Sequence, residues 1–161
     1  SGHQCQPVQF AWLQLRQLNL PMVLEFQLPG GGRRYVALLA MAGDTLKLTS
    51  GSTTGSFQVG DILPLWTGNA WVVWKPGTAI ANLVKPGETA PIVSWVRRQL
   101  GATAAPGPDN VYDDALKPRV VEFQKSRGLR ADGLLGMQTL LNLQTARQDP
   151  AVPLLVSPTP R

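Results

Sequence analysis

The chain has 161 residues, of which 43% are hydrophobic and only 16% are charged, and its formal net charge is +5. This length fits one compact domain or two small ones, and 14 prolines with 16 glycines predict many turns and short elements. A single cysteine excludes an intramolecular disulfide and a cysteine-rich zinc site, and a single histidine leaves no histidine cluster for a metal. We therefore expect neither a metal nor a cofactor.

The positive charge is spread along the chain. Residues 1–80 hold five basic and three acidic side chains, and residues 81–161 hold ten and seven. Nucleic-acid-binding proteins more often gather their basic residues on one face, so we expect no nucleic-acid partner. An anionic wall polymer or a membrane surface would also suit this charge, although solubility alone is the simpler explanation.

The sequence offers no apolar run long enough to cross a bilayer, and no signal peptide. It starts at Ser1 without a methionine, so we expect a fragment or a processed form. A membrane anchor would then lie in a segment that is absent from these 161 residues.

The first half alternates short elements with turns. Residues 9–18 carry apolar side chains three apart, which predicts a helix that Pro21 prevents from extending. We expect a polar loop at 50–56 and an irregular segment or short helix at 57–66. Alternation between Gly/Pro turns predicts about four antiparallel strands, at residues 22–28, 35–41, 45–49 and 70–75.

Trp66, Trp71 and Trp74 supply much of the apolar area of this first half. Such an aromatic cluster is either part of the core or a platform for carbohydrate, and the core is the commoner role in so small a unit. Cys5 is expected to be a small packing residue.

The second half changes from strand patterns to helix patterns after a Pro/Gly connector at 76–86. An apolar stripe predicts a helix that ends at Gly101, a second helix is expected to start at Asp113 or Asp114, and a third follows Gly136. Four prolines beyond residue 149 predict an extended or mobile tail. The expected division is into residues 1–78, 79–148 and 149–161.

The block Phe123-Gln124, Gly128-Leu129, Asp132-Gly133, Gly136 and Thr139 resembles the small three-helix peptidoglycan-binding domain. The resemblance implies that a glycan strand with its stem peptide lies in a shallow groove near the turn between the second and third helices. Arginines suit stem-peptide carboxylates through bidentate bonds, although ordinary solvated surface explains them equally well. Gln124 and Thr139 are expected to be half-exposed. The contacts that we infer are Tyr112, Gln124, Arg127, Arg130, Asp132 and Thr139.

The first half resembles the papain-like, C39-like peptidases that process bacteriocins. In that family a nucleophilic cysteine begins a helix, a histidine opens a strand before an aromatic residue and Val, and Asp-Pro follows the next strand. Here Arg34-Tyr35-Val36 stands at the histidine position and Thr49-Ser50 near the Asp-Pro position. The base and its orienting acid are both missing, and His3 is a poor substitute in a terminal segment two residues from Cys5. We therefore expect a degenerate domain with no catalytic residues.

A degenerate C39-like domain followed by a peptidoglycan-binding domain resembles the periplasmic C-terminal region of the general secretion pathway A family. The resemblance covers residues 5–146 and includes a short motif made of Trp12, Leu15, Leu18, Asn19 and Pro21. The family implies an α+β fold, in which a papain-like (C39-like) domain precedes a three-helix domain. It also implies a periplasmic location, as the soluble part of an inner-membrane protein that reaches the membrane only through a missing transmembrane segment. The implied partners are peptidoglycan and the pathway's B protein, with a possible homo-oligomer. The implied role is non-catalytic: helping the secretin of type II secretion assemble across the cell wall.

Two other functions remain open. The chain could be a cysteine peptidase or cell-wall amidase that the three-helix domain targets, against which stands the missing histidine on the second strand. It could also be a pure protein–protein interaction unit whose three-helix domain has lost glycan affinity.

Overall fold

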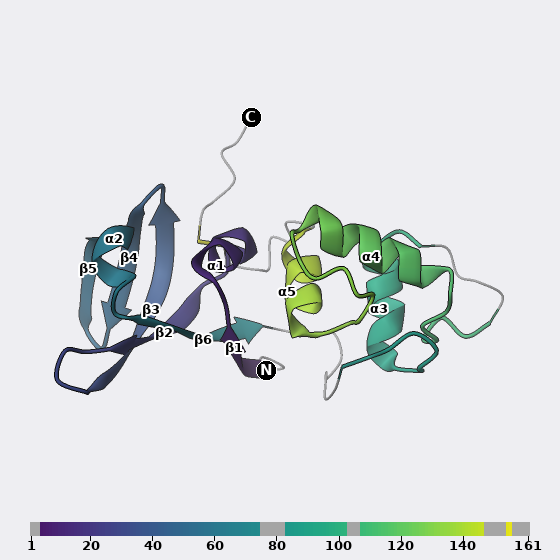
Figure 1. Cartoon of the computed structure of the whole chain (residues 1–161), viewed down its shortest axis with the longest axis horizontal. Helices are drawn as coiled ribbons and strands as arrows, with labels where there is room; N and C mark the ends of the chain where they lie inside the picture. The colour runs from purple at the N-terminus through teal and green to yellow at the C-terminus, as the bar shows by residue number, and fades with distance from the viewer. Residues whose placement is uncertain (1–3, 75–82, 103–106, 147–153, 156–161) are drawn as a thin grey trace. The chain divides into compact units, whose positions relative to one another are not determined.

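A computed structural model describes residues 4–74, 83–102, 107–146 and 154–155 of the chain. Two compact units divide the chain: Ser1–Trp74 with Pro150–Arg161, and Lys75–Asp149. The first unit contains a β-sheet and the second is helical (Figure 1), so the fold is α+β. Within the described residues, no helix combines the length and apolar character needed to span a membrane. Most of the connector expected at 76–86 lies outside the described residues.

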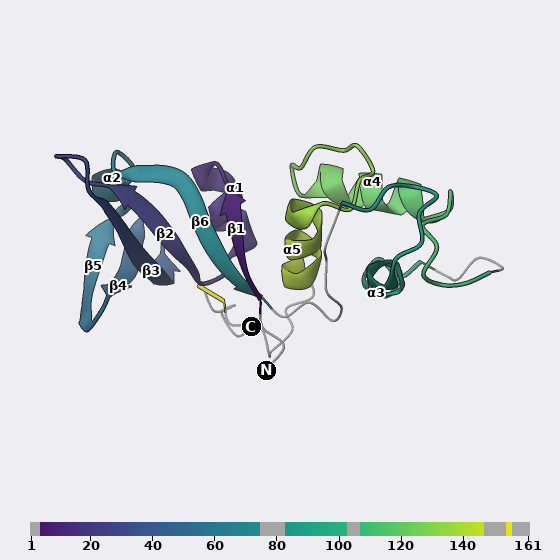
Figure 2. The ribbon, with the colours of Figure 1, turned by 90° about the horizontal axis from the view of Figure 1, so that it is seen from below.

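A single antiparallel sheet organises the first unit, with its six strands in the order β1-β6-β2-β3-β4-β5. A seven-residue helix, α1 (Trp12–Leu18), lies beside β1 and β6, and the short α2 (Val59–Ile62) connects β5 to β6 (Figure 2). The strands are β1 (Gln4–Gln9), β2 (Met22–Gln27), β3 (Arg33–Ala42), β4 (Thr45–Ser50), β5 (Thr53–Gln58) and β6 (Trp66–Trp74).

The side chains of the central strand β2 point alternately to the two faces of the sheet, and these two faces differ in character. Met22, Leu24 and Phe26 are buried on one side and belong to the same apolar core as Leu15 and Leu18 of α1. The other side presents the neighbouring positions, among them the buried carboxylate of Glu25, which has a network of its own that is described below.

Two of the six strands, β1 and β5, were not predicted. β1 contains Pro7 and lacks a clear alternation, and it is a strand because it pairs along its whole length with β6, sixty residues away. The segment expected as a polar loop at 50–56 is largely the exposed strand β5, which returns along β4 after a turn at Gly51 and Ser52. In both cases tertiary pairing outweighs weak local propensity.

The second unit has the three expected helices, α3 (Pro91–Gln99), α4 (Leu116–Ser126) and α5 (Met137–Ala146). Arg97 of α3 is only 4% exposed, and its guanidinium donates to the Asp113 carboxylate at 2.8 Å and to the Val111 carbonyl at 2.9 Å. The same carboxylate accepts the Leu116 backbone N–H at 2.8 Å, at the start of α4. Burial raises the pKa of Asp113, but these hydrogen bonds and the Arg97 charge outweigh it, so the pKa lies below its ordinary value. The pair therefore ties α3 to the start of α4.

The expectation of an unpacked tail at 149–161 is wrong at Leu155. This side chain is 4% exposed, its N–H donates to the Asn19 carbonyl at 3.0 Å, and its carbonyl accepts from the Met41 N–H at 3.2 Å. The prolines suggested an extended chain, but Leu154 and Leu155 between them provide apolar area that the first unit can bury. The rest of the tail lies outside the described residues, apart from Leu154.

Candidate functional site

The turn between α4 and α5 is organised by the side-chain amide of Gln124, which is 1% exposed. Its oxygen accepts the Gly133 N–H at 2.9 Å, and its nitrogen donates to the Leu134 carbonyl at 3.0 Å and to Thr139 Oγ1 at 3.1 Å. A single amide thus satisfies backbone groups of the turn that burial would otherwise leave unpaired, and this fixes the path of the chain.

Two glycines and one aspartate shape the same turn. Gly128, at φ +64°, lets α4 end while the Leu129 N–H returns to the Gln124 carbonyl at 2.9 Å. Gly133 has a φ of +72°, and a Cβ there would lie 3.3 Å from side-chain atoms of α4. Asp132 Oδ1 accepts the Leu134 N–H at 2.9 Å, so the side chain of the aspartate closes the turn by binding the backbone two residues further along the chain.

A second anchor comes from the segment before α4. Tyr112 is fully buried, and its hydroxyl donates to the Gly133 carbonyl at 2.6 Å. Burial, with the Asp132 charge as a smaller cause, raises the pKa of Tyr112 to about 12. The hydroxyl therefore keeps its proton, and with it the hydrogen bond to the turn, throughout the physiological range.

The start of the helical unit closes against the same turn. The Leu135 N–H donates to the Val84 carbonyl at 3.0 Å, and the Val84 N–H donates to the Leu135 carbonyl at 3.3 Å. Gly136 brings the chain close to this segment, since a Cβ on it would lie 3.2 Å from Leu83 Cδ1. Three separate stretches of the unit therefore converge on one turn.

The residues predicted as ligand contacts fall into two groups. Tyr112, Gln124 and Thr139 are 0%, 1% and 4% exposed, so the expectation that Gln124 and Thr139 are half-exposed is wrong. Each has a hydrogen bond that shapes the turn, as described above, and a buried side chain does not reach a ligand. Their role in the turn was missed because sequence gives the polarity of a side chain but not its partners.

The other predicted contacts, Arg127, Arg130 and Asp132, are accessible. The Arg130 side chain is 89% exposed, and its Nε lies 3.6 Å from Asp132 Oδ2. The Arg127 guanidinium carbon lies 5.6 Å from the centroid of the Phe123 ring, in cation–π geometry. Two cations and a carboxylate are thus displayed on or beside a turn of fixed shape, and ligand contact by these three residues stays a prediction.

The structure does not place Cys5 where the resemblance to the C39-like peptidases implied. Cys5 is in β1, not at the start of a helix, and it is exposed, so its expected packing role is wrong. Arg34 is in β3, and strands β6 and β2 lie between β1 and β3. His3 lies outside the described residues, which contain no group of three or more His, Cys, Asp or Glu side chains that could hold a metal.

The family described as "Putative peptidoglycan binding domain" matches residues 90–143. This range includes α3, α4, the α4–α5 turn and most of α5. General secretion pathway protein A of Aeromonas hydrophila is 26% identical over 153 residues, which are 93% of this chain and 28% of that protein. The chain is a homologue of general secretion pathway protein A. It spans little more than a quarter of the length of this relative.

A solved structure supports the relationship for both units. It is the crystal structure of a periplasmic domain of the EpsAB fusion protein of the Vibrio vulnificus type II secretion system. The TM-score is 0.51 and the sequence identity 26%, over 89% of this chain and 64% of that one. Over the matched residues, this homologue of general secretion pathway protein A is therefore similar in fold to that periplasmic domain.

The raised pKa of Tyr112 has a measurable consequence. In the Tyr35→Phe variant Tyr112 is the only tyrosine, and we expect its ultraviolet titration in the folded protein near pH 12, about two units above an exposed tyrosine. The pKa of Tyr112 is higher in the folded than in the unfolded protein, so the protonated hydroxyl stabilises the fold. This stabilisation is fully present below pH ~10 and declines as the pH rises from about 10 towards 12. Protein unfolded in urea is the control and should titrate near pH 10. Titration of folded Tyr112 near pH 10 would contradict the buried hydrogen bond.

Proposed function

We propose that this chain is a non-catalytic, peptidoglycan-binding scaffold of a type II secretion assembly protein, which helps the secretin assemble across the cell wall. The observation that carries the proposal is the match of residues 90–143 to the peptidoglycan-binding family, within a chain whose homology to general secretion pathway protein A extends over 93% of its length. The proposed location is the periplasm, in keeping with the periplasmic domain of the Vibrio vulnificus protein.

Peptidoglycan binding is proposed to involve the exposed groups at the α4–α5 turn. The guanidinium of Arg130, and that of Arg127 beside it, can form charge-assisted hydrogen bonds with the carboxylates of a stem peptide. The turn itself is held by Gln124 and Tyr112, so binding does not have to order the backbone. Preorganisation of this kind lowers the entropic cost of holding a flexible polymer.

The pathway's B protein is the proposed protein partner. The Vibrio vulnificus relative is an EpsAB fusion protein, and such a fusion keeps the two components side by side. We propose that in this protein the same association is made between separate chains. The two compact units would then act as separate domains, close to the expected division at residues 1–78 and 79–148.

The first unit is proposed to be a degenerate, C39-like domain. A helix followed by antiparallel strands supports this proposal, as does the position of Arg34-Tyr35-Val36 on β3. A guanidinium does not accept a proton at neutral pH, and two strands separate it from the strand of Cys5. Arg34 therefore cannot serve as the adjacent base that activates a cysteine nucleophile.

The first prediction concerns the accessible arginines. The variant Arg127→Ala/Arg130→Ala should bind purified sacculi about tenfold more weakly, equivalent to ~1.4 kcal/mol, because it removes two charge-assisted donors. Co-sedimentation measures this binding, and the urea midpoint reports on folding. The matched control is Lys85→Ala/Arg119→Ala, which removes the same charge from other exposed positions. If both variants lose the same amount of sacculus binding, the loss comes from the change in net charge and not from these two arginines. If the Arg127→Ala/Arg130→Ala variant binds sacculi as the unchanged protein does, the binding site lies elsewhere.

The second prediction concerns hydrolysis. Muropeptides and peptide substrates incubated with the protein should be recovered intact, because Arg34 stands where the family's histidine would take the proton of the thiol and then give it to the leaving amine. Chromatography of the products measures this, with a wall amidase as the positive control on the same muropeptides. Cleavage that is lost in both Cys5→Ser and His3→Ala would restore the cysteine peptidase or cell-wall amidase alternative.

A further inference from the structure

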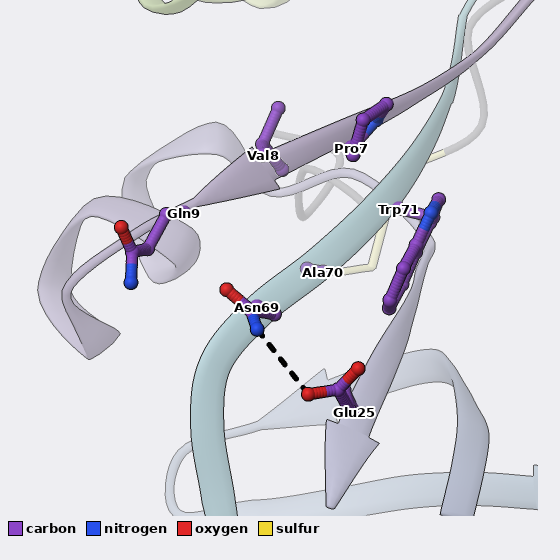
Figure 3. Close-up of a pocket in the computed structure, with 7 residues that line it drawn as sticks. All are labelled: Pro7, Val8, Gln9, Glu25, Asn69, Ala70 and Trp71. Atoms are coloured by element: carbon purple, nitrogen blue, oxygen red, sulfur yellow. Dashed lines mark hydrogen bonds between the residues drawn. The ribbon is translucent and has the colours of Figure 1, made fainter.

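A pocket of ≈ 360 Å³ lies on the first unit, along the sheet face that presents Glu25 (Figure 3). Three adjacent strands contribute to it: β1 supplies Pro7 and Gln9, β6 supplies Asn69 and Trp71, and β2 supplies Glu25. Pro7 is directly opposite Trp71 and Gln9 directly opposite Asn69, so these four side chains share one face of the sheet. The pocket is therefore formed within one sheet and needs no other part of the chain.

The floor of the pocket is a carboxylate fixed by hydrogen bonds. Glu25 is 3% exposed and accepts from Asn69 Nδ2 at 3.2 Å, from Thr67 Oγ1 at 3.1 Å and from the Tyr35 hydroxyl at 3.3 Å. The Asn69 hydrogen bond is the largest cause of a lowered pKa, so Glu25 is ionised at neutral pH despite its burial. Arg33 lies 3.7 Å from the same carboxylate and offsets its charge.

These bonds also set the direction of the other polar groups. The amide nitrogen of Asn69 donates to Glu25, and the dashed line in Figure 3 marks this hydrogen bond. The amide oxygen of Asn69 is therefore the group that can accept from a ligand. Gln9 adds an exposed amide with both donor and acceptor. Trp71 borders the pocket, and its ring meets that of Tyr35 edge-on, with centroids 5.2 Å apart and planes at 81°. The indole is thus held in place by packing.

We propose that this pocket binds one or two sugar rings of a glycan strand. A half-buried indole offers an apolar surface to the C–H face of a sugar, and the amides of Asn69 and Gln9 suit hydroxyl groups, which both donate and accept. The buried Glu25 contributes by holding Asn69 in place. A cationic ligand suits the pocket less well, since Arg33 already offsets Glu25. A peptide added as a further strand along β1 is also disfavoured, because Pro7 in this edge strand has no N–H to donate.

The pocket lies in a different unit from the α4–α5 turn, so the two would hold the wall polymer at separate points. Two weak contacts on one polymer bind more tightly together than either does alone, as the second becomes intramolecular. The choice of a wall glycan as the ligand rests on the proposed function, whereas the preference for a sugar rests on the pocket itself.

The test is a titration of the full, ¹⁵N-labelled chain with a tetramer of N-acetylglucosamine, followed by nuclear magnetic resonance. We expect saturable shifts of the Trp71 indole N–H and of the Asn69 and Gln9 side-chain amides. Trp71→Leu should weaken binding about tenfold, since it removes the flat aromatic surface on which a sugar ring would stack. Gln9→Ala, an exposed change that does not threaten folding, should weaken it about threefold. Gln17→Ala, at an exposed position of α1, is the matched control and should bind as the unchanged protein does.

Two results would overturn the assignment: shifts confined to residues 83–146, or a tetralysine peptide that shifts these resonances while the sugar does not. Sacculus co-sedimentation of Trp71→Leu and of Arg127→Ala/Arg130→Ala separates this proposal from the proposed function. If the sugar leaves the pocket unchanged but sacculus binding still depends on the arginines, this pocket fails alone. If the unchanged protein does not sediment with sacculi at all, the proposed function fails as well.

Discussion

The hydrogen bonds of the Gln124 amide are the interaction on which the second unit depends. They join the end of α4 to Gly133, Leu134 and Thr139, and so determine where the chain runs before α5 begins. Buried backbone groups left without these partners would cost about 1–3 kcal/mol each, so no apolar side chain can replace this amide without loss. The exposed Arg130 and the half-buried Asp132 acquire their positions from this turn, and Asp132 Oδ1 also accepts from the Gln124 amide nitrogen at 3.3 Å.

The first unit uses a buried polar network in a comparable way. Glu25 collects donors from β3 and β6 at the middle of a sheet whose opposite face is apolar core. In the helical unit the network fixes a turn that displays charged side chains, and in the sheet it fixes the floor of a pocket. In each unit the buried polar group orients its neighbours, and the more accessible side chains around it are those we propose to meet the ligand.

The sequence predicted the elements whose signals are local. The apolar stripe of α3, Gly128 at the end of α4 and the alternation in β2 and β4 each led to an element that the structure contains. β1 and β5 escaped prediction because their reason to be strands is a partner strand, which composition does not reveal. Leu155 was missed for the same reason, since its burial requires Asn19 and Met41 at the far end of the sequence.

The turn between α4 and α5 was predicted, but the roles of the residues around it were not. The Phe-Gln, Gly-Leu and Asp-Gly block led to the correct turn, because these residue types are the ones a tight helix–helix connection needs. Sequence polarity made Gln124, Thr139 and Tyr112 candidates for ligand contact, yet each is buried and holds the turn. Whether a polar side chain faces solvent or backbone depends on the packing of three separate segments, which no single window of sequence contains.

A buried amide, out of reach of any ligand, sets the shape of the turn that we propose binds peptidoglycan. Gln124→Leu keeps the size of the side chain but leaves the Gly133 N–H unpaired and the Leu134 carbonyl with only the longer, 3.4 Å hydrogen bond from Thr139 Oγ1, so unfolding in urea should become easier by about 1–3 kcal/mol. Gln138→Leu, at an exposed position of α5, is the matched control. The deciding measurement is co-sedimentation with purified sacculi below the unfolding midpoint of both variants. We predict weakened binding by Gln124→Leu and unchanged binding by Gln138→Leu, and full binding by a folded Gln124→Leu protein would contradict the claim.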